Sequence, residues 1–230
     1  MRLQVDQLTV MRRQTPAVDG LQLQIDGAEL VALVGPNGAG KTTLMRTLSG
    51  LIAPHRGSIT LLGTDITHLA PEERVKRGLV HVPEGRRLFG TLTVAENLEL
   101  GCWCHGDRDL GRVLAWLPEL APLLEQPAGS LSTAEAQLCA VARALAANPA
   151  VLLIDEISLG LSPAAASRLF SLLPELVSTG MAVLFVEQDV GRALSVADRV
   201  YALDRGRVVA AGPPGELLVH HAFRGFELGA

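Results

Sequence analysis

Aromatic residues, cysteines and net charge are all scarce in this chain. Phe, Trp and Tyr account for 3% of its 230 residues, and its formal charge at pH 7 is −4. Few nucleic-acid bases could stack on such side chains, and the overall charge gives no general attraction to nucleic acid, so we expect no nucleic-acid partner. Three cysteines cannot all pair within one chain, which argues against a disulfide framework and favours a reducing compartment.

Long apolar runs are also missing. The N-terminus carries no apolar run of signal-peptide length, and no other segment is long enough to span a membrane. Hydrophobic residues nevertheless make up 48% of the chain, which is enough to build a full core. We therefore expect residues 1–230 to form a single folded unit, and any work at a membrane to need a partner that supplies the spanning segments.

The first third of the chain has the pattern of short strands. Residues 3–10 and 21–25 partly alternate between apolar and polar, as half-buried strands do, whereas residues 30–34 are apolar almost throughout. Further strands are predicted at residues 57–62 and 79–82. Because the early strands lie close together with turns between them, they indicate an antiparallel sheet joined to a parallel core.

The middle of the chain has a helical pattern, from residue 93 to about residue 147. Thr93 and Glu96 have the spacing of a capping box at the start of a helix. Three prolines between residues 115 and 127 indicate broken helix and loop. We take residues 88–140 as a helical subdomain inserted between two halves of an α/β core.

The last part of the chain alternates between strands and helices. Buried strands are predicted at residues 151–154 and 182–186, and residues 200–203 and 208–211 should form a hairpin around the turn at 204–206.

One helix of this last part has a clear start. Pro163 follows Ser162, an arrangement typical of a helix N-terminus, and Pro174 is expected to kink or split that helix.

A complete phosphate-binding loop follows the apolar run at residues 30–34. It consists of Gly35, Pro36, Asn37, Gly38, Ala39, Gly40, Lys41, Thr42 and Thr43, which fit the pattern G-x-x-x-x-G-K-[S/T]. Glycines let several backbone N–H groups point at phosphate oxygens, and a helix start adds partial positive charge. We expect Lys41 to reach the β- and γ-phosphates of ATP, and the Thr42 hydroxyl to bind Mg²⁺.

Two carboxylates follow another buried run, residues 151–154. Asp155 is expected to bind Mg²⁺, and Glu156, one residue further on, to polarise the water that attacks the γ-phosphate. An apolar run that ends in Asp-Glu is weak evidence alone. Together with the loop at Lys41 it predicts ATP hydrolysis.

These two motifs, with a helical stretch between them, resemble the ATP-binding cassette (ABC) transporter ATPases over essentially the whole chain. The resemblance implies a P-loop NTPase core, in which helices flank a mixed, mainly parallel sheet, with an N-terminal antiparallel β part and a helical insert. In that family two cassettes sandwich two ATP molecules, each held between the P-loop of one subunit and the signature motif of the other.

The signature position holds Leu-Ser-Thr-Ala-Glu, where the family pattern is Leu-Ser-Gly-Gly-Gln/Glu. Ser132 and Glu135 match, so the resemblance implies that they face the partner's ATP, whereas Thr133 and Ala134 replace both glycines. The two added side chains should crowd the phosphate or prevent a left-handed backbone. An ordinary helix cap without a ligand is the alternative. An altered signature favours a heterodimer whose two ATP sites are unequal.

Three other family positions carry unusual residues. Glu84 stands at the Q-loop position, where most members have Gln, and the resemblance implies that it serves Mg²⁺ and the attacking water. Gln188 stands at the switch position, usually His, and can hydrogen-bond a phosphate without carrying a titratable charge. Arg12 stands where an aromatic residue usually stacks on adenine, and its guanidinium plane is a candidate replacement, although exposure to solvent is equally compatible.

Several departures together resemble one subfamily, the second ATPase subunit (LivF type) of branched-chain amino-acid importers. They are Val-Pro-Glu-Gly-Arg-Arg at residues 82–87, Leu-Thr-Val-x-Glu-Asn-Leu at 92–98, and Val-Glu-Gln at 186–188. The resemblance implies a second ATPase subunit, transmembrane permease subunits and, indirectly, a solute-binding protein as partners. It also implies a peripheral location on the cytoplasmic face of the cell membrane. Arg86 and Arg87 are candidates for contact with the permease.

Other functions stay open at this point. An importer of urea or another small amide is similar, and Glu84 favours the amino-acid importer because we associate that other group with Gln. A soluble ABC ATPase of translation or DNA repair usually has two cassettes in one chain or a long coiled-coil insertion, and this sequence has neither. A catalytically weak regulatory subunit is suggested by Thr133 and Ala134.

Overall fold

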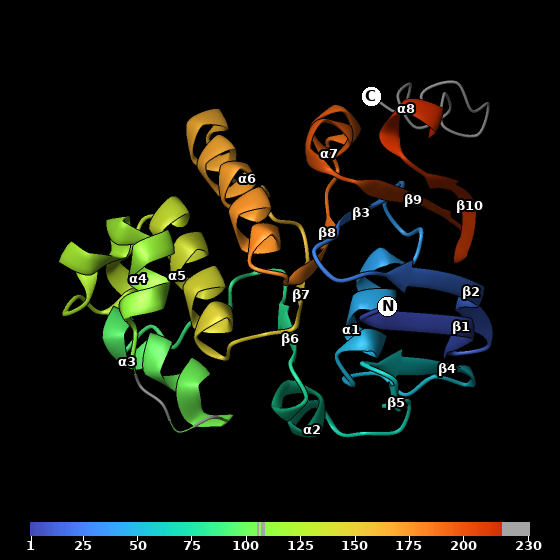
Figure 1. The fold of residues 1–230 in the computed structure, drawn as a ribbon, viewed down its shortest axis with the longest axis horizontal. Coiled ribbons are helices and arrows are strands. Elements are labelled where there is room, and N and C mark those ends of the chain that lie inside the picture. Colours follow the sequence, from blue (N-terminus) through green and yellow to red (C-terminus); the bar gives the residue numbers. More distant parts are fainter. Residues whose placement is uncertain (105, 107–108, 218–230) are drawn as a thin grey trace.

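A computed structural model describes residues 1–104, 106 and 109–217 of the chain (Figure 1). A four-stranded antiparallel sheet has the order β2-β1-β4-β5 and consists of β1 (Leu3–Arg12), β2 (Thr15–Ile25), β4 (Arg56–Leu61) and β5 (Thr64–Asp65). The expected antiparallel part is thus confirmed. β2 begins at Thr15 rather than at the predicted residue 21. Its first half was missed because register shifts in its pairing with β1 interrupt the alternation that marks a strand in sequence.

A six-stranded sheet forms the centre of the molecule, with the order β10-β9-β3-β8-β7-β6. Its strands are β3 (Leu30–Val34), β6 (Leu79–Val82), β7 (Val151–Ile154), β8 (Ala182–Val186), β9 (Arg199–Asp204) and β10 (Arg207–Gly212). All neighbours are parallel except β9 and β10, which form the predicted hairpin. β3 lies between β8 and β9, so the strand before the phosphate loop is central.

Helices pack on both sides of this sheet. The α-helices are α1 (Lys41–Leu48), α2 (Pro71–Lys76), α3 (Val94–Glu99), α4 (Gly111–Trp116), α5 (Thr133–Ala146), α6 (Pro163–Ser178), α7 (Val190–Val196) and α8 (Pro214–Leu217). Short 3₁₀ helices are η1 (Leu100–Cys104), η2 (Pro118–Leu123) and η3 (Ala128–Ser130). Figure 1 shows α5 and α6 on one side of the central strands, and α1 with the antiparallel sheet on the other.

The central strands are apolar throughout because each of their faces contacts a different core. In β3, Leu30, Ala32 and Val34 belong to the core that includes α5 and α6. Val31 and Leu33 belong to the core shared with α1 and the antiparallel sheet. A strand buried on both faces needs no polar positions, so the uninterrupted apolar run has its physical cause here.

The predicted helix starts are confirmed. Thr93 with Glu96, and Ser132 with Glu135, form reciprocal capping boxes at the starts of α3 and α5, and Ser162 caps α6 ahead of Pro163. Pro174 does not split α6, which continues to Ser178. Pro174 is exposed, and the apolar side of α6 stays packed on the sheet.

The segment between α3 and α5 is broken as its prolines predicted. It contains η1, α4, η2 and η3, and Pro122 lies inside η2.

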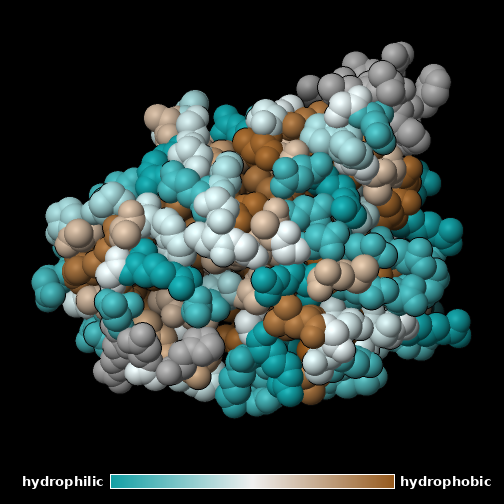
Figure 2. All heavy atoms as spheres, viewed as in Figure 1, coloured by the Kyte–Doolittle hydropathy of each residue, from teal (hydrophilic) through white to brown (hydrophobic). Residues whose placement is uncertain are grey.

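Crossing a bilayer would need a longer and more apolar helix than any that the described residues form. Figure 2 shows a face on which hydrophilic residues predominate, interrupted by several separate apolar patches.

Candidate active site

The phosphate loop connects β3 to α1 and depends on glycine at two points. Gly35 and Gly40 have φ angles of 149° and 109°. A Cβ atom would lie 2.1 Å from the Leu203 carbonyl oxygen at the first position and 2.3 Å from the Ala17 carbonyl oxygen at the second. The loop rests directly on β2 and the end of β9, and only glycine, which has no Cβ, fits at these two positions.

Lys41 is held under the loop. Its Nζ donates to the carbonyl oxygens of Gly35 at 2.6 Å and Pro36 at 3.0 Å. Burial lowers the pKa of Lys41, whereas the charges of Glu156 and Asp155 raise it. A cation held by neutral carbonyls next to two acids is ready to exchange those contacts for phosphate oxygens.

A pocket of about 310 Å³ opens over the loop. Its lining consists of Arg12, Ala17, Asn37, Gly38, Gly40, Lys41, Thr42, Thr43 and Glu156. A second pocket of about 430 Å³ is lined by Arg12, Arg46, Leu51, Ile52, Pro83, Glu84, Arg87 and Asp155. Most of the site residues predicted from sequence therefore line one of two pockets that share Arg12. Ser132 and Glu135, at the start of α5, are not among the described residues that line them.

Asp155 follows β7 and is 2% exposed. Its Oδ1 accepts no hydrogen bond from any residue that the structure describes. Burial raises the pKa of Asp155 to about 6, the charges of Glu156 and Glu84 add to the rise, and the Thr42 hydroxyl opposes it. A buried carboxylate oxygen without a donor, beside other carboxylates and a hydroxyl, suits a hard divalent cation such as Mg²⁺.

Glu156 and Gln188 are in direct contact. Gln188 Nε2 donates to Glu156 Oε1 at 2.8 Å, and Glu156 has a φ of 50°, which non-glycine residues seldom adopt. The segments after β7 and β8 thus meet through their side chains. One oxygen of the Glu156 carboxylate is engaged by an amide that cannot titrate, while the carboxylate remains on the pocket wall.

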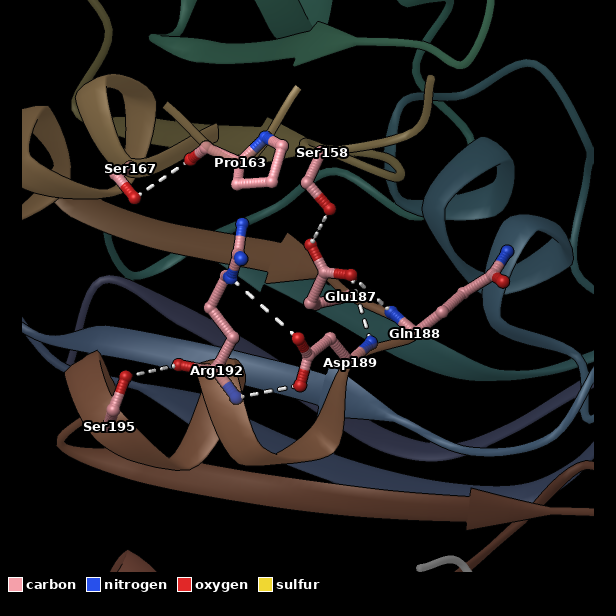
Figure 3. A network of polar contacts seen from close by, with 8 residues as sticks. All are labelled: Ser158, Pro163, Ser167, Glu187, Gln188, Asp189, Arg192 and Ser195. Atoms are coloured by element: carbon pink, nitrogen blue, oxygen red, sulfur yellow. Dashed lines mark hydrogen bonds and ion pairs between the residues drawn. The ribbon is translucent and has the colours of Figure 1, made fainter. Parts of the chain in front are cut away.

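Glu187 supports this pair and was missed from the sequence. Its side chain is 3% exposed and accepts hydrogen bonds from Ser158 Oγ at 2.6 Å and from the backbone N–H groups of Gln188 at 2.7 Å and Asp189 at 2.9 Å. Figure 3 shows these contacts, with the Gln188 side chain extending away from them. The position of Glu187 directly after a buried strand was the only signal in the sequence. Its hydrogen bond with Ser158 could not be predicted, because the fold brings the two residues together.

Arg86 is partly exposed and makes two side-chain contacts within the chain. Its Nε donates to Gln137 Oε1 at 3.1 Å and its Nη2 to the Leu159 carbonyl at 3.3 Å. Arg87 is exposed and lines the second pocket, and contact of either arginine with a permease stays a prediction.

Comparisons with known proteins agree with this geometry. The family model described as ABC transporter matches residues 18–158. The chain is 36% identical to the high-affinity branched-chain amino acid transport ATP-binding protein BraG of Pseudomonas aeruginosa, over 99% of each chain. It is 38% identical to the probable branched-chain amino acid transport ATP-binding protein LivF of Archaeoglobus fulgidus, over 84% of each. It is also 31% identical to the lipopolysaccharide export system ATP-binding protein LptB of Haemophilus influenzae, over 94% of this chain and 92% of that one.

Solved structures share the fold. An ATP-binding cassette of an ABC transporter in its ADP conformation has a TM-score of 0.87 and 25% identity, covering 100% of this chain and 99% of that one. A dimeric bacterial ABC transporter cassette has a TM-score of 0.81 and 25% identity, covering 92% and 98%.

The fold and the phosphate loop define a nucleotide-binding P-loop ATPase. The chain belongs to the ABC transporter family. Within that family it is an ATP-binding subunit that hydrolyses ATP, and it resembles the ATPases of branched-chain amino-acid importers.

Proposed function

We propose that this chain hydrolyses ATP with Glu156 as the general base and so energises amino-acid import, of branched-chain amino acids in particular. The observation that carries the chemistry is the contact between Gln188 Nε2 and Glu156 Oε1, at 2.8 Å, which engages a residue that lines the phosphate-loop pocket. One carboxylate oxygen is oriented by the amide. The other is available to accept the proton of the attacking water.

The remaining roles follow from charge and position. The loop residues Gly35, Pro36, Asn37, Gly38, Ala39, Gly40, Lys41, Thr42 and Thr43 surround the phosphates, and Lys41 exchanges its two carbonyl partners for phosphate oxygens. Thr42, Asp155 and Glu84 would hold Mg²⁺, which would neutralise phosphate charge. Arg12, which lines both pockets, is the candidate for stacking on adenine.

We further propose how the chain is divided and assembled. Residues 88–140 form a helical subdomain within a single nucleotide-binding domain. Ser132 and Glu135, at the exposed start of α5, serve the ATP on a second ATPase subunit, in a heterodimer with unequal sites. Transmembrane permease subunits supply the membrane path, a solute-binding protein delivers the solute, and the chain sits peripherally on the cytoplasmic face of the membrane.

The transported solute rests on relatedness. The two importer ATPases are 36% and 38% identical to this chain, and the export ATPase 31%. We therefore propose a branched-chain amino-acid importer, with an importer of urea or another small amide as the alternative. In vesicles that contain the complex with its solute-binding protein, leucine should stimulate ATP hydrolysis and enter, and urea should do neither. Stimulation by urea alone would reverse the choice.

The chemistry is tested by Glu156→Gln in the reconstituted complex. We expect phosphate release to fall more than about a hundredfold, because a general base is worth that much, while ATP binding persists. Glu125→Gln, at an exposed position away from both pockets, is the matched control and should leave turnover unchanged. Turnover by Glu156→Gln within error of the wild type would refute the assignment.

A further inference from the structure

Three consecutive residues between β6 and α3 have a left-handed backbone. Gly85, Arg86 and Arg87 have φ angles of 79°, 62° and 52°, and the Arg87 N–H donates to the Gly85 carbonyl at 2.6 Å. Glycine adopts this conformation freely, but both arginines have a Cβ that disfavours it. Such a turn persists only where its surroundings hold it in place.

Arg143 on α5 supplies the holding contacts. Its Nη1 donates to the Arg87 carbonyl at 2.9 Å, and its Nη2 donates to the Arg86 carbonyl at 3.1 Å. The two carbonyls belong to the two strained residues. A planar guanidinium fits this pair because its two donors are fixed in a fork, an arrangement that a lysine ammonium cannot reproduce.

A second contact ties the same turn to other parts of the site. The Arg86 side chain donates to Gln137, also on α5, and to the Leu159 carbonyl after β7. Gln137 is 5% exposed, so its oxygen has little access to water as an alternative partner. The turn, the helix that begins at Ser132 and the segment that follows Glu156 are thus joined by two arginines.

The turn immediately follows Glu84. Glu84 and Asp155 line the same pocket, and Arg87 lines it too. A change in the backbone at residues 85–87 would move Glu84 relative to Asp155, because only one peptide unit separates the turn from that side chain.

We propose that Arg143 is a positioning residue for ATP hydrolysis, which holds residues 85–87 in the left-handed conformation and thereby keeps Glu84 beside Asp155. Arg143 touches neither pocket among the described residues, so its effect passes through the turn. The inference rests on the proposed role of Glu84.

The test compares Arg143 variants in which residue 87 is strained with variants in which glycine at residue 87 removes that strain. In the reconstituted complex, Arg143→Met should lower kcat about tenfold or more, because small displacements of catalytic groups have effects of that size, with a much smaller change in KM for ATP. Arg143→Lys should not restore kcat. Arg87→Gly should restore part of it in the Arg143→Met background, because glycine removes the strain at one of the two arginines.

Arg87→Ala in the same background is the matched control. It removes the same side chain but keeps the Cβ that causes the strain, so it should not restore kcat. Equal activity of the two double variants, or wild-type kcat in Arg143→Met, would overturn the proposal.

Amide hydrogen exchange of the full chain separates this inference from the role of Glu84. Arg143→Met should speed exchange around residues 85–88, and Arg87→Gly should reverse part of that change, whether or not Glu84 serves the metal. Unchanged exchange would refute the positioning role even for a variant that does not assemble. If exchange behaves as expected but Glu84→Gln has wild-type kcat, the turn is held as proposed and the role given to Glu84 is wrong.

Discussion

His81 on β6 and Asp155 at the end of β7 are titratable residues on neighbouring parallel strands, of which Asp155 is buried and His81 partly buried. Each has one polar atom, His81 Nε2 and Asp155 Oδ1, without a hydrogen-bond partner in the part of the chain that the structure describes. Burial lowers the pKa of His81 to about 4, with a further contribution from the Arg46 charge, whereas burial raises that of Asp155 to about 6. The fold therefore keeps both side chains neutral at mildly acid pH.

The two shifts have opposite effects on stability. Between pH 4 and 6, the folded chain holds a proton on Asp155 that the unfolded chain has released, so this residue makes the free energy of unfolding fall as pH rises. Between pH 4 and 6.5, the unfolded chain binds a proton on His81 that the folded chain excludes, so this residue makes the free energy of unfolding rise with pH. In the wild-type chain the two contributions oppose each other.

Single substitutions should expose each contribution. From pH 4 to 7, the unfolding free energy of Asp155→Asn should rise by about 2 kcal/mol relative to that of the wild type, because each pKa unit corresponds to about 1.4 kcal/mol and Asp155 is already partly titrated at both ends of this range. His81→Leu should lose a similar amount, about 2 kcal/mol, over the same range. Urea unfolding without nucleotide and with a metal chelator measures both differences. Parallel pH profiles for the three proteins would contradict the assigned causes.

At the scale of elements, Arg74 joins α2 to the end of α1. It is 1% exposed and donates to the carbonyls of Leu69, Thr47, Leu48 and Thr67 at distances of 2.7–3.0 Å. Two of these carbonyls, those of Thr47 and Leu48, lie at the end of α1, and the Thr47 carbonyl also accepts from the Gly50 N–H at 3.1 Å. α2 was not predicted from sequence, so its role as the support of α1 was not foreseen.

Arg74→Met should therefore destabilise the chain by about 3 kcal/mol, because it leaves several buried carbonyls without donors. Arg77→Met is the control, since Arg77 is largely exposed and pairs with Glu73 on the surface, and it should cost less than about 1 kcal/mol. Urea denaturation of both variants at neutral pH gives the comparison. Equal midpoints would show that water replaces Arg74 at those carbonyls.

The sequence predicted features whose causes are local. Buried strands, capping boxes and the phosphate loop each need particular residues at a fixed spacing, so β3, α5 and Gly35–Thr43 could be recognised. Contacts between distant segments could not, because their partners are chosen by packing. The Gln188–Glu156 bond and the Arg86–Gln137 bond are examples, with partners 32 and 51 positions apart. The split expected as one outcome at Pro174 does not occur, because packing of α6 outweighs one missing backbone hydrogen bond.

At the scale of the whole molecule, the altered signature concerns a neighbouring subunit. Thr133 and Ala134 are the first residues of α5 and follow Ser132 in a regular helical start, without a left-handed residue at either position. The idea that glycine is needed there for its backbone is therefore not supported by this conformation. Crowding of a partner's phosphate by the two side chains is what remains.

In a mixed dimer, Thr133→Gly combined with Ala134→Gly should raise ATP hydrolysis a few-fold if crowding limits it. The same exchange costs helix stability, up to about 1 kcal/mol for each glycine. Ala164→Gly with Ala165→Gly, at the start of α6, is a matched control for that cost and should give no gain. Unchanged or lower turnover in the signature variant would count against crowding and favour the regulatory subunit.

The position of β3 between β8 and β9 has a consequence for synthesis of the chain. Residues 30–43 leave the ribosome early, but their strand neighbours follow some 150 positions later, and the Gly206 N–H reaches back to the Ala39 carbonyl at 2.8 Å. Until β9 and β10 emerge, the loop has its contact with β2 but lacks its contacts with Leu203 and Gly206. Nucleotide therefore stabilises the complete loop only after these strands are made, and a shorter nascent chain must avoid aggregation without that help from its own ligand.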